Sequence, residues 1–186
     1  MTMLVSEDTV RNGPSRWRAG PIVEVVSPPL ATPTMVGDSD PLDKRTGTQM
    51  TDATDFNTQI IQEFRDNAGV VGGPFSGATL VLLSTIGAKS GQVRVNPLMC
   101  RIEGDRLFVF ASKAGAPTNP DWYHNVVADH RVTVEVGAET FEAVATVLEG
   151  RERDRVFAAN AEQYPVFDDY QAGIDRVIPV IALDPS

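Results

Sequence analysis

Two cations and two glycines lie close together in the stretch Leu83–Pro97, which reads LSTIGAKSGQVRVNP. Lys89 falls in a glycine-containing turn, and Arg94 and Asn96 follow on the next apolar run, where strand alternation points both side chains to one face. Cations and converging backbone amides in such a turn can hold an oxyanion such as a phosphate. The pattern therefore predicts an anion-binding hairpin. The alternative is a solvated surface turn with incidental charges.

The distribution of charge favours an anionic small ligand. The chain of 186 residues has a formal net charge of −9, which argues against a nucleic-acid partner because phosphate backbones favour basic surfaces. Residues 84–125 hold five cations and three anions, a net charge of +2, whereas residues 126–186 hold five cations and twelve anions, a net charge of −7. The positive part of this acidic chain is thus the part that carries the hairpin.

Four sequence blocks follow the hairpin: FASKAG at 110–115, NPDWYHN at 119–125, YPVFDDY at 164–170 and DRVIPV at 175–180. In this order and spacing, and from about Phe56 to Pro185, the chain resembles the deazaflavin-dependent nitroreductase family of actinobacteria, which uses coenzyme F420. The resemblance implies an α+β fold, a split β-barrel of the FMN-binding-like type. It is a mostly antiparallel six-stranded barrel with flanking helices, and coenzyme F420 is the expected cofactor.

The resemblance also implies roles for the matching residues. Ser112 is similar to a serine that hydrogen-bonds the deazaflavin ring or the substrate; a turn hydroxyl at a strand end is the alternative. The expected catalytic residues are Ser112, Tyr164 and Tyr170. The expected cofactor-binding residues are Ala88, Lys89, Ser90, Arg94, Val95, Asn96, Phe110, Ala111, Ser112, Lys113, Asp121, Trp122, Tyr123, His124, Asn125 and Phe167.

The acceptor pocket is expected beside these residues. Tyr164, Phe167 and Tyr170 are three residues apart, so on a helical turn they would share one side and wall the pocket together with Met99. Phe167 and Met99 stand where family members often have tyrosine. The expected pocket is therefore more apolar, and activity on nitroimidazole prodrugs does not follow from the resemblance. His124 receives no acid or base role.

These residues predict an oxidoreductase that transfers a hydride from C5 of reduced deazaflavin to an electrophilic small-molecule acceptor such as a quinone, an enone or a nitroaromatic. The cofactor performs the difficult step, and Ser112, Tyr164 or Tyr170 would donate to the developing oxyanion. One alternative is an FMN-dependent split-barrel oxidoreductase of the pyridoxamine-oxidase type. Another is a carrier protein that binds F420 without turnover.

Other residue types limit the remaining functions. The single Cys100 excludes an intrachain disulfide, and its apolar strand favours a buried, inert thiol. Two histidines without a cluster of ligands at metal spacing predict no metal site. No long apolar run or signal peptide is evident, so a cytoplasmic location is expected. Contact with the inner face of the membrane is left open but not indicated, as is the choice between monomer and homodimer.

The elements that must position the site begin after a proline-rich segment. Prolines interrupt residues 1–54 every few positions, which predicts a disordered or weakly ordered tail before a single domain at 55–186. An apolar stripe from Phe56 to Ala68 predicts a helix, capped by Thr54 or Asp55 and ended by Gly69. Alternating and β-branched runs predict strands at 79–86, 93–102, 107–112, 131–136, 140–148 and 177–183, with helices after Asn119 and over 149–163.

Overall fold

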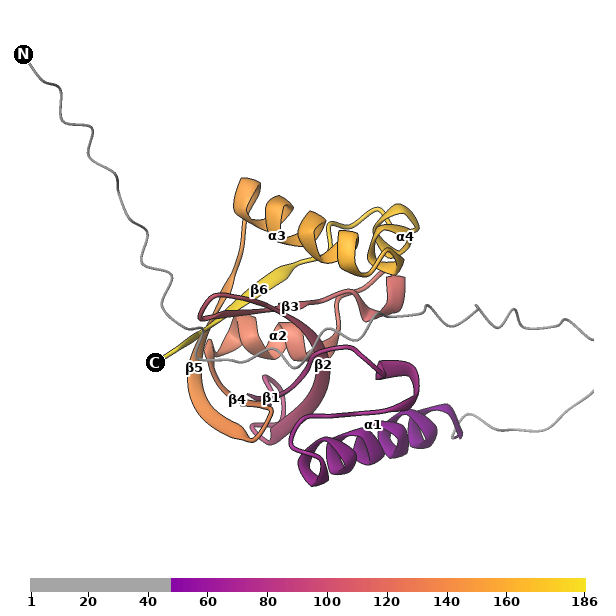
Figure 1. Cartoon of the computed structure of the whole chain (residues 1–186), viewed down its shortest axis with the longest axis vertical. Helices are drawn as coiled ribbons and strands as arrows, with labels where there is room; N and C mark the ends of the chain where they lie inside the picture. The colour runs from indigo at the N-terminus through magenta and orange to yellow at the C-terminus, as the bar shows by residue number, and fades with distance from the viewer. Residues whose placement is uncertain (1–47) are drawn as a thin grey trace, which may run out of the picture.

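The computed structural model describes residues 48–186, with side chains from residue 56 onward, and contains one six-stranded sheet. The strands are β1 (Leu80–Ile86), β2 (Val93–Glu103), β3 (Arg106–Phe110), β4 (Arg131–Val136), β5 (Glu139–Val147) and β6 (Val180–Pro185). They close into a barrel in the order β1-β2-β3-β6-β5-β4 (Figure 1), and all six pairings are antiparallel. The predicted barrel is confirmed.

Four α-helices and two 3₁₀ turns surround this barrel. The helices are α1 (Thr48–Asp66), α2 (Asp121–Ala128), α3 (Gly150–Gln163) and α4 (Val166–Ala172), and the turns are η1 (Gly73–Phe75) and η2 (Lys113–Gly115). Within the described part of the chain, every helix is too short or too polar to cross a lipid bilayer.

Alternation of side chains builds the barrel interior. Val132, Val134 and Val136 point inward from β4 and belong to one apolar cluster with Ala143 and Ala145 of the paired strand β5. Helix α2 lies across one end of the barrel (Figure 1), and its residues Trp122 and Val126 join the same apolar cluster. The helix that carries part of the predicted site is therefore fixed by the core.

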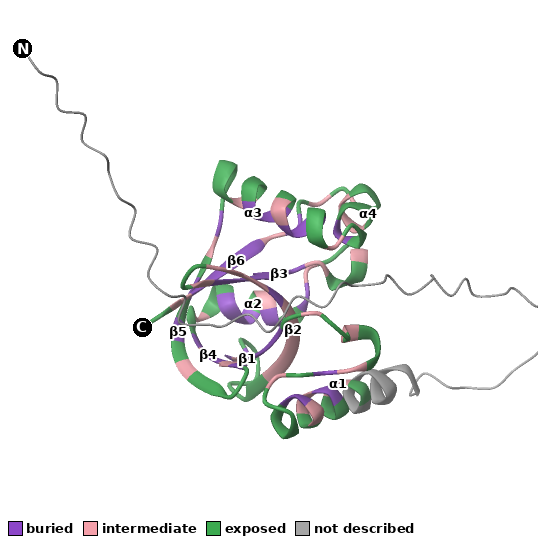
Figure 2. Cartoon of the chain, in the orientation of Figure 1, coloured by how far each residue is buried: buried purple, intermediate pink, exposed green. Residues whose placement is uncertain are grey.

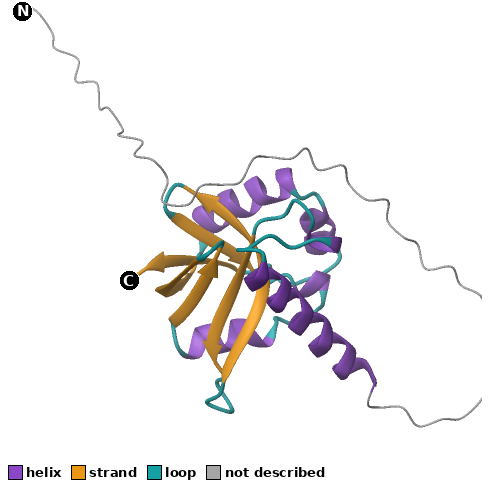
Figure 3. Ribbon diagram, turned by 60° about the horizontal axis from the view of Figure 1, so that its bottom comes forward, coloured by secondary structure: helices purple, strands orange, loops and turns teal. Residues whose placement is uncertain are grey.

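Two further apolar layers cover the outside of the barrel. Helix α1 packs Ile60 and Phe64 against Leu80 and Leu82 of β1. Helices α3 and α4 cover β3 and β6 on the other side, where Phe157 and Phe167 belong to one buried cluster with residues of both strands. Figure 2 shows that β3 and β6, which lie beside α3, are buried whereas much of β5 is exposed, and Figure 3 shows the helices around the sheet.

Several element boundaries differ from the sequence prediction. Helix α1 begins at Thr48 instead of at 54 or 55, because its apolar stripe starts only at Phe56, whereas the polar turns before it are already helical. Strand β3 ends at Phe110, before Ser112, and β6 begins at Val180, after Val177. At the end of β3 and before the start of β6, side chains form hydrogen bonds with backbone groups that would otherwise pair with a neighbouring strand. The predicted tail at residues 1–54 lies almost entirely outside the described residues, so the boundary at 54/55 stays a prediction.

Candidate active site

A cavity of about 240 Å³ opens where β2, η2, α2 and α4 meet. Seven of the predicted site residues line it: Met99, Phe110, Ser112, Lys113, Trp122, Phe167 and Tyr170. Five others were not predicted: Phe75, Pro97, Leu98, Ala114 and Val166. Ala114 and Val166 lie inside the blocks that carry the family resemblance, whereas Phe75 lies in a glycine- and proline-rich stretch without a periodic pattern. The cavity is largely apolar, with the polar groups of Ser112, Lys113 and Tyr170 at its wall.

The loop that carries Ser112 has an unusual backbone. Lys113, Ala114 and Gly115 adopt φ values of 50°, 49° and 76°, and positive φ is uncommon for residues other than glycine. A Cβ atom on Gly115 would also lie 3.2 Å from Cδ1 of Tyr170, so a side chain there would strain the backbone and crowd the Tyr170 ring. The Lys113 ammonium donates to Thr118 Oγ1 at 3.0 Å. The loop thus has one defined shape at the edge of the cavity.

Aromatic rings form the α4 side of the cavity. Phe167 is only 4% exposed, and its ring centroid lies 5.4 Å from that of Phe110 and 5.8 Å from that of Tyr170, in edge-to-face contacts. Such contacts stabilise ring pairs beyond the burial of their surface. The wall is therefore rigid as well as apolar.

Tyr164 packs against the same apolar cluster as Phe167 and Tyr170 but lies outside the helix that carries them. It is the C-terminal cap of α3, with φ −131° and ψ 83°, and Pro165 follows before α4 begins. The three rings are thus not on one continuous helix, contrary to the prediction. The Tyr164 hydroxyl accepts a hydrogen bond from Gln163 Nε2 at 3.2 Å, and burial raises the pKa of this hydroxyl above its ordinary value. Tyr164 is not among the residues that line the cavity.

The turn between β1 and β2 differs from an amide nest. The N–H groups of Ser90 and Gly91 donate to Gly87 O, at 3.2 and 2.7 Å. The N–H of Ala88 donates to Asn125 Oδ1 at 3.0 Å. These amides are therefore occupied, which corrects the expectation that they converge on an oxyanion. Lys89 and Arg94 of this hairpin are still available to bind an anion, because neither forms a salt bridge among the described residues.

Strand β2 connects this turn with the cavity. Arg94 and Asn96 share one face, as predicted, and Leu98 on the same face lines the cavity and packs against the barrel interior. Pro97 and Met99, on the opposite face, line the cavity too. Four residues along a strand span about 13 Å. The strand therefore runs from an exposed arginine to an apolar cavity.

The predicted residues of α2 have different positions. Trp122 is 5% exposed and lines the cavity, and Asn125 is buried beneath the hairpin turn. Asp121 and His124 are exposed, and Tyr123 packs partly on the barrel interior. Ala111, Tyr123 and His124 do not line the cavity, nor do the predicted hairpin residues. Cys100 is also outside it; the thiol is buried, which raises its pKa to about 12.

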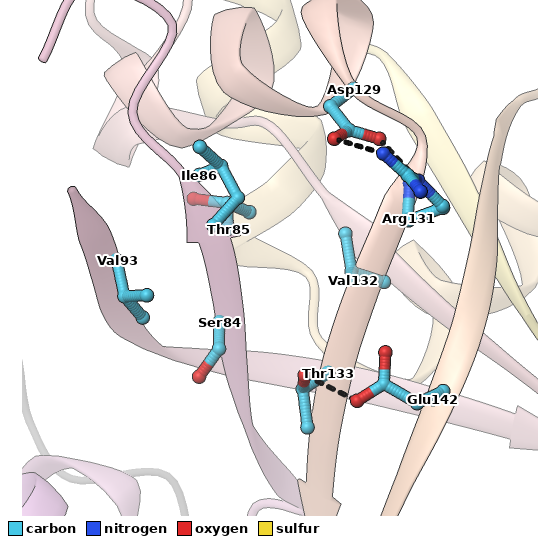
Figure 4. A pocket seen from close by; sticks show the side chains of 9 residues that line it. All are labelled: Ser84, Thr85, Ile86, Val93, Asp129, Arg131, Val132, Thr133 and Glu142. Carbon is cyan, nitrogen blue, oxygen red and sulfur yellow. Dashed lines mark hydrogen bonds and ion pairs between the residues drawn. The ribbon is translucent and has the colours of Figure 1, made fainter. Parts of the chain in front are cut away.

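A second cavity of about 240 Å³ lies between β1, β4 and β5 (Figure 4) and contains none of the predicted residues. Its cation, Arg131, donates to both carboxylate oxygens of Asp129 at 3.2 Å, and Thr133 donates to Glu142 at 2.9 Å. With its single cation paired and two carboxylates at its wall, this cavity does not favour an anionic cofactor. The cavity beside Ser112 is the better candidate. Among the described residues, no cluster of His, Cys, Asp or Glu could hold a metal ion.

Comparison with known proteins identifies the family. The sequence model of the F420H2-dependent quinone reductases matches residues 57–185. The chain belongs to this family. An F420H2-dependent quinone reductase of Mycobacterium tuberculosis is 35% identical over 127 residues, which cover 64% of this chain and 83% of the relative. The resemblance inferred from the four blocks is thereby confirmed, and coenzyme F420 is the cofactor of the family.

Solved structures of similar proteins agree with this membership. An F420H2-dependent reductase is 40% identical, with a TM-score of 0.53, and the match covers 56% of this chain and 93% of that protein. A structure described as a domain-swapped dimer is 37% identical, with a TM-score of 0.55, and covers 73% of this chain and all of that one. This member of the F420H2-dependent quinone reductase family therefore shares its fold with an F420H2-dependent reductase of known structure.

Proposed function

We propose that this F420H2-dependent reductase binds reduced coenzyme F420 along β2 and passes a hydride to a quinone in the cavity beside Ser112. The observation that carries the proposal is the course of β2, from Arg94 at the hairpin to Pro97, Leu98 and Met99 at the cavity. An elongated cofactor with an anionic tail and a flat ring fits such a surface, because cations stand at one end and apolar and aromatic side chains at the other.

The residues of the chain have separate tasks in this proposal. Lys89 and Arg94 hold the anionic part through charge-assisted hydrogen bonds, which are roughly twice as strong as neutral ones. Trp122 and Leu98 pack on the ring and exclude water. Reduced deazaflavin, when bound, supplies the hydride. Ser112 and Tyr170 present hydroxyl groups at the cavity wall, where a donor would stabilise negative charge on the acceptor oxygen.

The wall of the cavity supports a quinone as the acceptor. Phe110, Phe167 and Met99 offer flat or flexible apolar surface, and two hydroxyl donors suffice for the two oxygens of a quinone ring. An enone or a nitroaromatic presents similar oxygens and is the secondary class of acceptor. The cytoplasmic location, membrane contact and the choice between monomer and homodimer stay predictions from the sequence.

Equilibrium titration with F420 and with FMN tests the cofactor assignment. We expect saturable binding of F420 and at most weak binding of FMN, and Trp122→Phe should weaken F420 binding less than removal of a hairpin cation does. Tight binding of FMN together with no binding of F420 would replace the proposal by the FMN-dependent alternative.

A further inference from the structure

One arginine outside the predicted site binds the backbone of the Ser112 loop at several points. The Arg176 guanidinium donates to Ala111 O at 3.1 Å, Ser112 O at 2.8 Å and Ala116 O at 3.0 Å. It also donates to the side-chain oxygen of Asn119 at 2.7 Å. All four acceptors are neutral and lie within residues 111–119. No salt bridge in the described part of the chain pairs Arg176 with a carboxylate, and burial lowers the pKa of the guanidinium.

The segment that carries Arg176 is itself fixed. Gln171 on α4 donates from Nε2 to Arg176 O at 2.8 Å, and its Oε1 accepts from the N–H of Ile178 at 2.9 Å. Arg153 of α3 donates to Ile178 O at 2.7 Å and to Gln171 Oε1 at 3.1 Å. These bonds explain why β6 starts only at Val180. They also fix the backbone at Arg176 and at Ile178, so the Arg176 side chain leaves the backbone at a defined position.

The loop at residues 111–119, which the Arg176 guanidinium binds, has a backbone that needs support from its surroundings. Lys113 and Ala114 have positive φ, and residues in this region persist only where the surrounding structure determines them. Two of the bonded carbonyls, those of Ala111 and Ser112, come directly before these residues. The planar fork of arginine, with five donors, can bind several carbonyls at once, whereas lysine offers a single point charge.

We propose that Arg176 is a positioning residue that holds the Ser112 hydroxyl and the Lys113 backbone at the cavity wall. The effect of Arg176 on catalysis rests on the proposed function, whereas its hydrogen bonds to the loop do not. The arginine acts through the loop, and it is not among the residues that line the cavity. Loss of the fork should release residues 111–119 before it affects the barrel.

Amide hydrogen exchange of the full chain without ligand tests this hold. In Arg176→Lys, we expect exchange in 111–119 to rise by about tenfold or more, while β1 and β4 keep their protection. The matched control is Arg101→Lys, since Arg101 likewise donates to a backbone carbonyl, Ala159 O at 2.9 Å, but touches no residue of the loop. Asn119→Ala removes one acceptor and should give a smaller increase, which keeps the test valid if Arg176→Lys does not fold.

Kinetics then connect the hold with the reaction. Turnover of reduced F420 with menadione should fall about tenfold in Arg176→Lys, and Ser112→Ala should cost less in that background than in the parent protein. Unchanged exchange of residues 111–119 in Arg176→Lys would overturn the proposal. An equal rise in exchange of these residues in Arg101→Lys would also overturn it. If the parent protein does not bind F420, the proposed function fails, and the exchange result still decides the role of Arg176.

Discussion

Asn125 on α2 and Ala88 in the β1–β2 turn are joined by a hydrogen bond: Asn125 Oδ1 accepts from the N–H of Ala88 at 3.0 Å. The other end of the same amide, Nδ2, donates to Thr85 Oγ1 at 3.1 Å, and both side chains are buried. The helix that supplies Trp122 to the cavity therefore also fixes the turn that carries Lys89. The two ends of the proposed cofactor site are held in one arrangement by one side chain.

Asn125→Ala should lower the free energy of unfolding by about 1–3 kcal/mol, because it removes the partner of a part-buried N–H and of a buried hydroxyl. Urea denaturation measures the change, and exposed Asn67→Ala serves as the control, with little expected effect. In a double-mutant cycle with Thr85→Val, the two losses should not add, because both remove the same hydrogen bond. Additive losses would show that Asn125 and Thr85 contribute independently.

Lys89→Ala and Arg94→Ala should each weaken F420 binding by about 1.5–3 kcal/mol, the usual contribution of a hydrogen bond to a charged group. Both side chains are exposed, so the effect should shrink as salt is added. Titration at two salt concentrations measures this, with Arg151→Ala on the exposed surface of α3 as the control. Dissociation constants that match the parent protein in both variants would remove the hairpin from the site.

Local patterns were sufficient to predict the barrel but not all of its strand ends. Strict alternation over 131–136 and 140–148 specifies inward faces, and that signal lies within each segment. The ends of β3 and β6 depend on side chains distant in sequence, since Arg176 binds Ala111 O across 65 positions. The amides of the β1–β2 turn also depend on a distant side chain, because the Ala88 N–H donates to Asn125, 37 positions away. A sequence pattern contains no signal for such bonds.

The site was predicted to the extent that the family blocks contain it. Ser112, Lys113 and Trp122 lie in these blocks and line the cavity. Phe75 and Leu98 line it too, but each looks like an ordinary apolar residue in its own segment. The helical spacing assumed for Tyr164 failed because Tyr164 itself has a non-helical backbone between α3 and α4. Positions that depend on how elements pack therefore required the structure.

Tyr170→Phe should change turnover with menadione while the affinity for F420 and the melting temperature stay nearly unchanged, because only a hydroxyl at the cavity wall is lost. The expected size is about 0.5–1.5 kcal/mol in kcat/KM, that of one neutral hydrogen bond. Tyr164→Phe is the matched control, and its kinetics should equal those of the parent protein. If Tyr164→Phe alters turnover and Tyr170→Phe does not, the donor lies on the α3 side and the cavity is misassigned.

Burial of Cys100 predicts a loss of stability at alkaline pH. The thiol pKa is raised to about 12 in the folded chain, above its ordinary value of 9.0, so the folded state keeps the proton longer than the unfolded state. This contribution is complete below the unfolded pKa and is lost as pH rises from about 9 toward 12. Urea denaturation across this range should show a shallower decline for Cys100→Ala. Rapid labelling of the native thiol near neutral pH would contradict the burial on which the prediction depends.

Anaerobic oxidation of reduced F420 by menadione tests the central claim most directly. The full-length protein, reduced F420 and menadione are mixed, and deazaflavin oxidation is followed against samples that lack protein or lack menadione. We predict saturable oxidation that requires both, with reduced FMN a poor substitute as the hydride source. Binding of reduced F420 without menadione-dependent oxidation, or oxidation that proceeds with FMN and not with F420, would contradict the assignment of this chain as an F420H2-dependent quinone reductase.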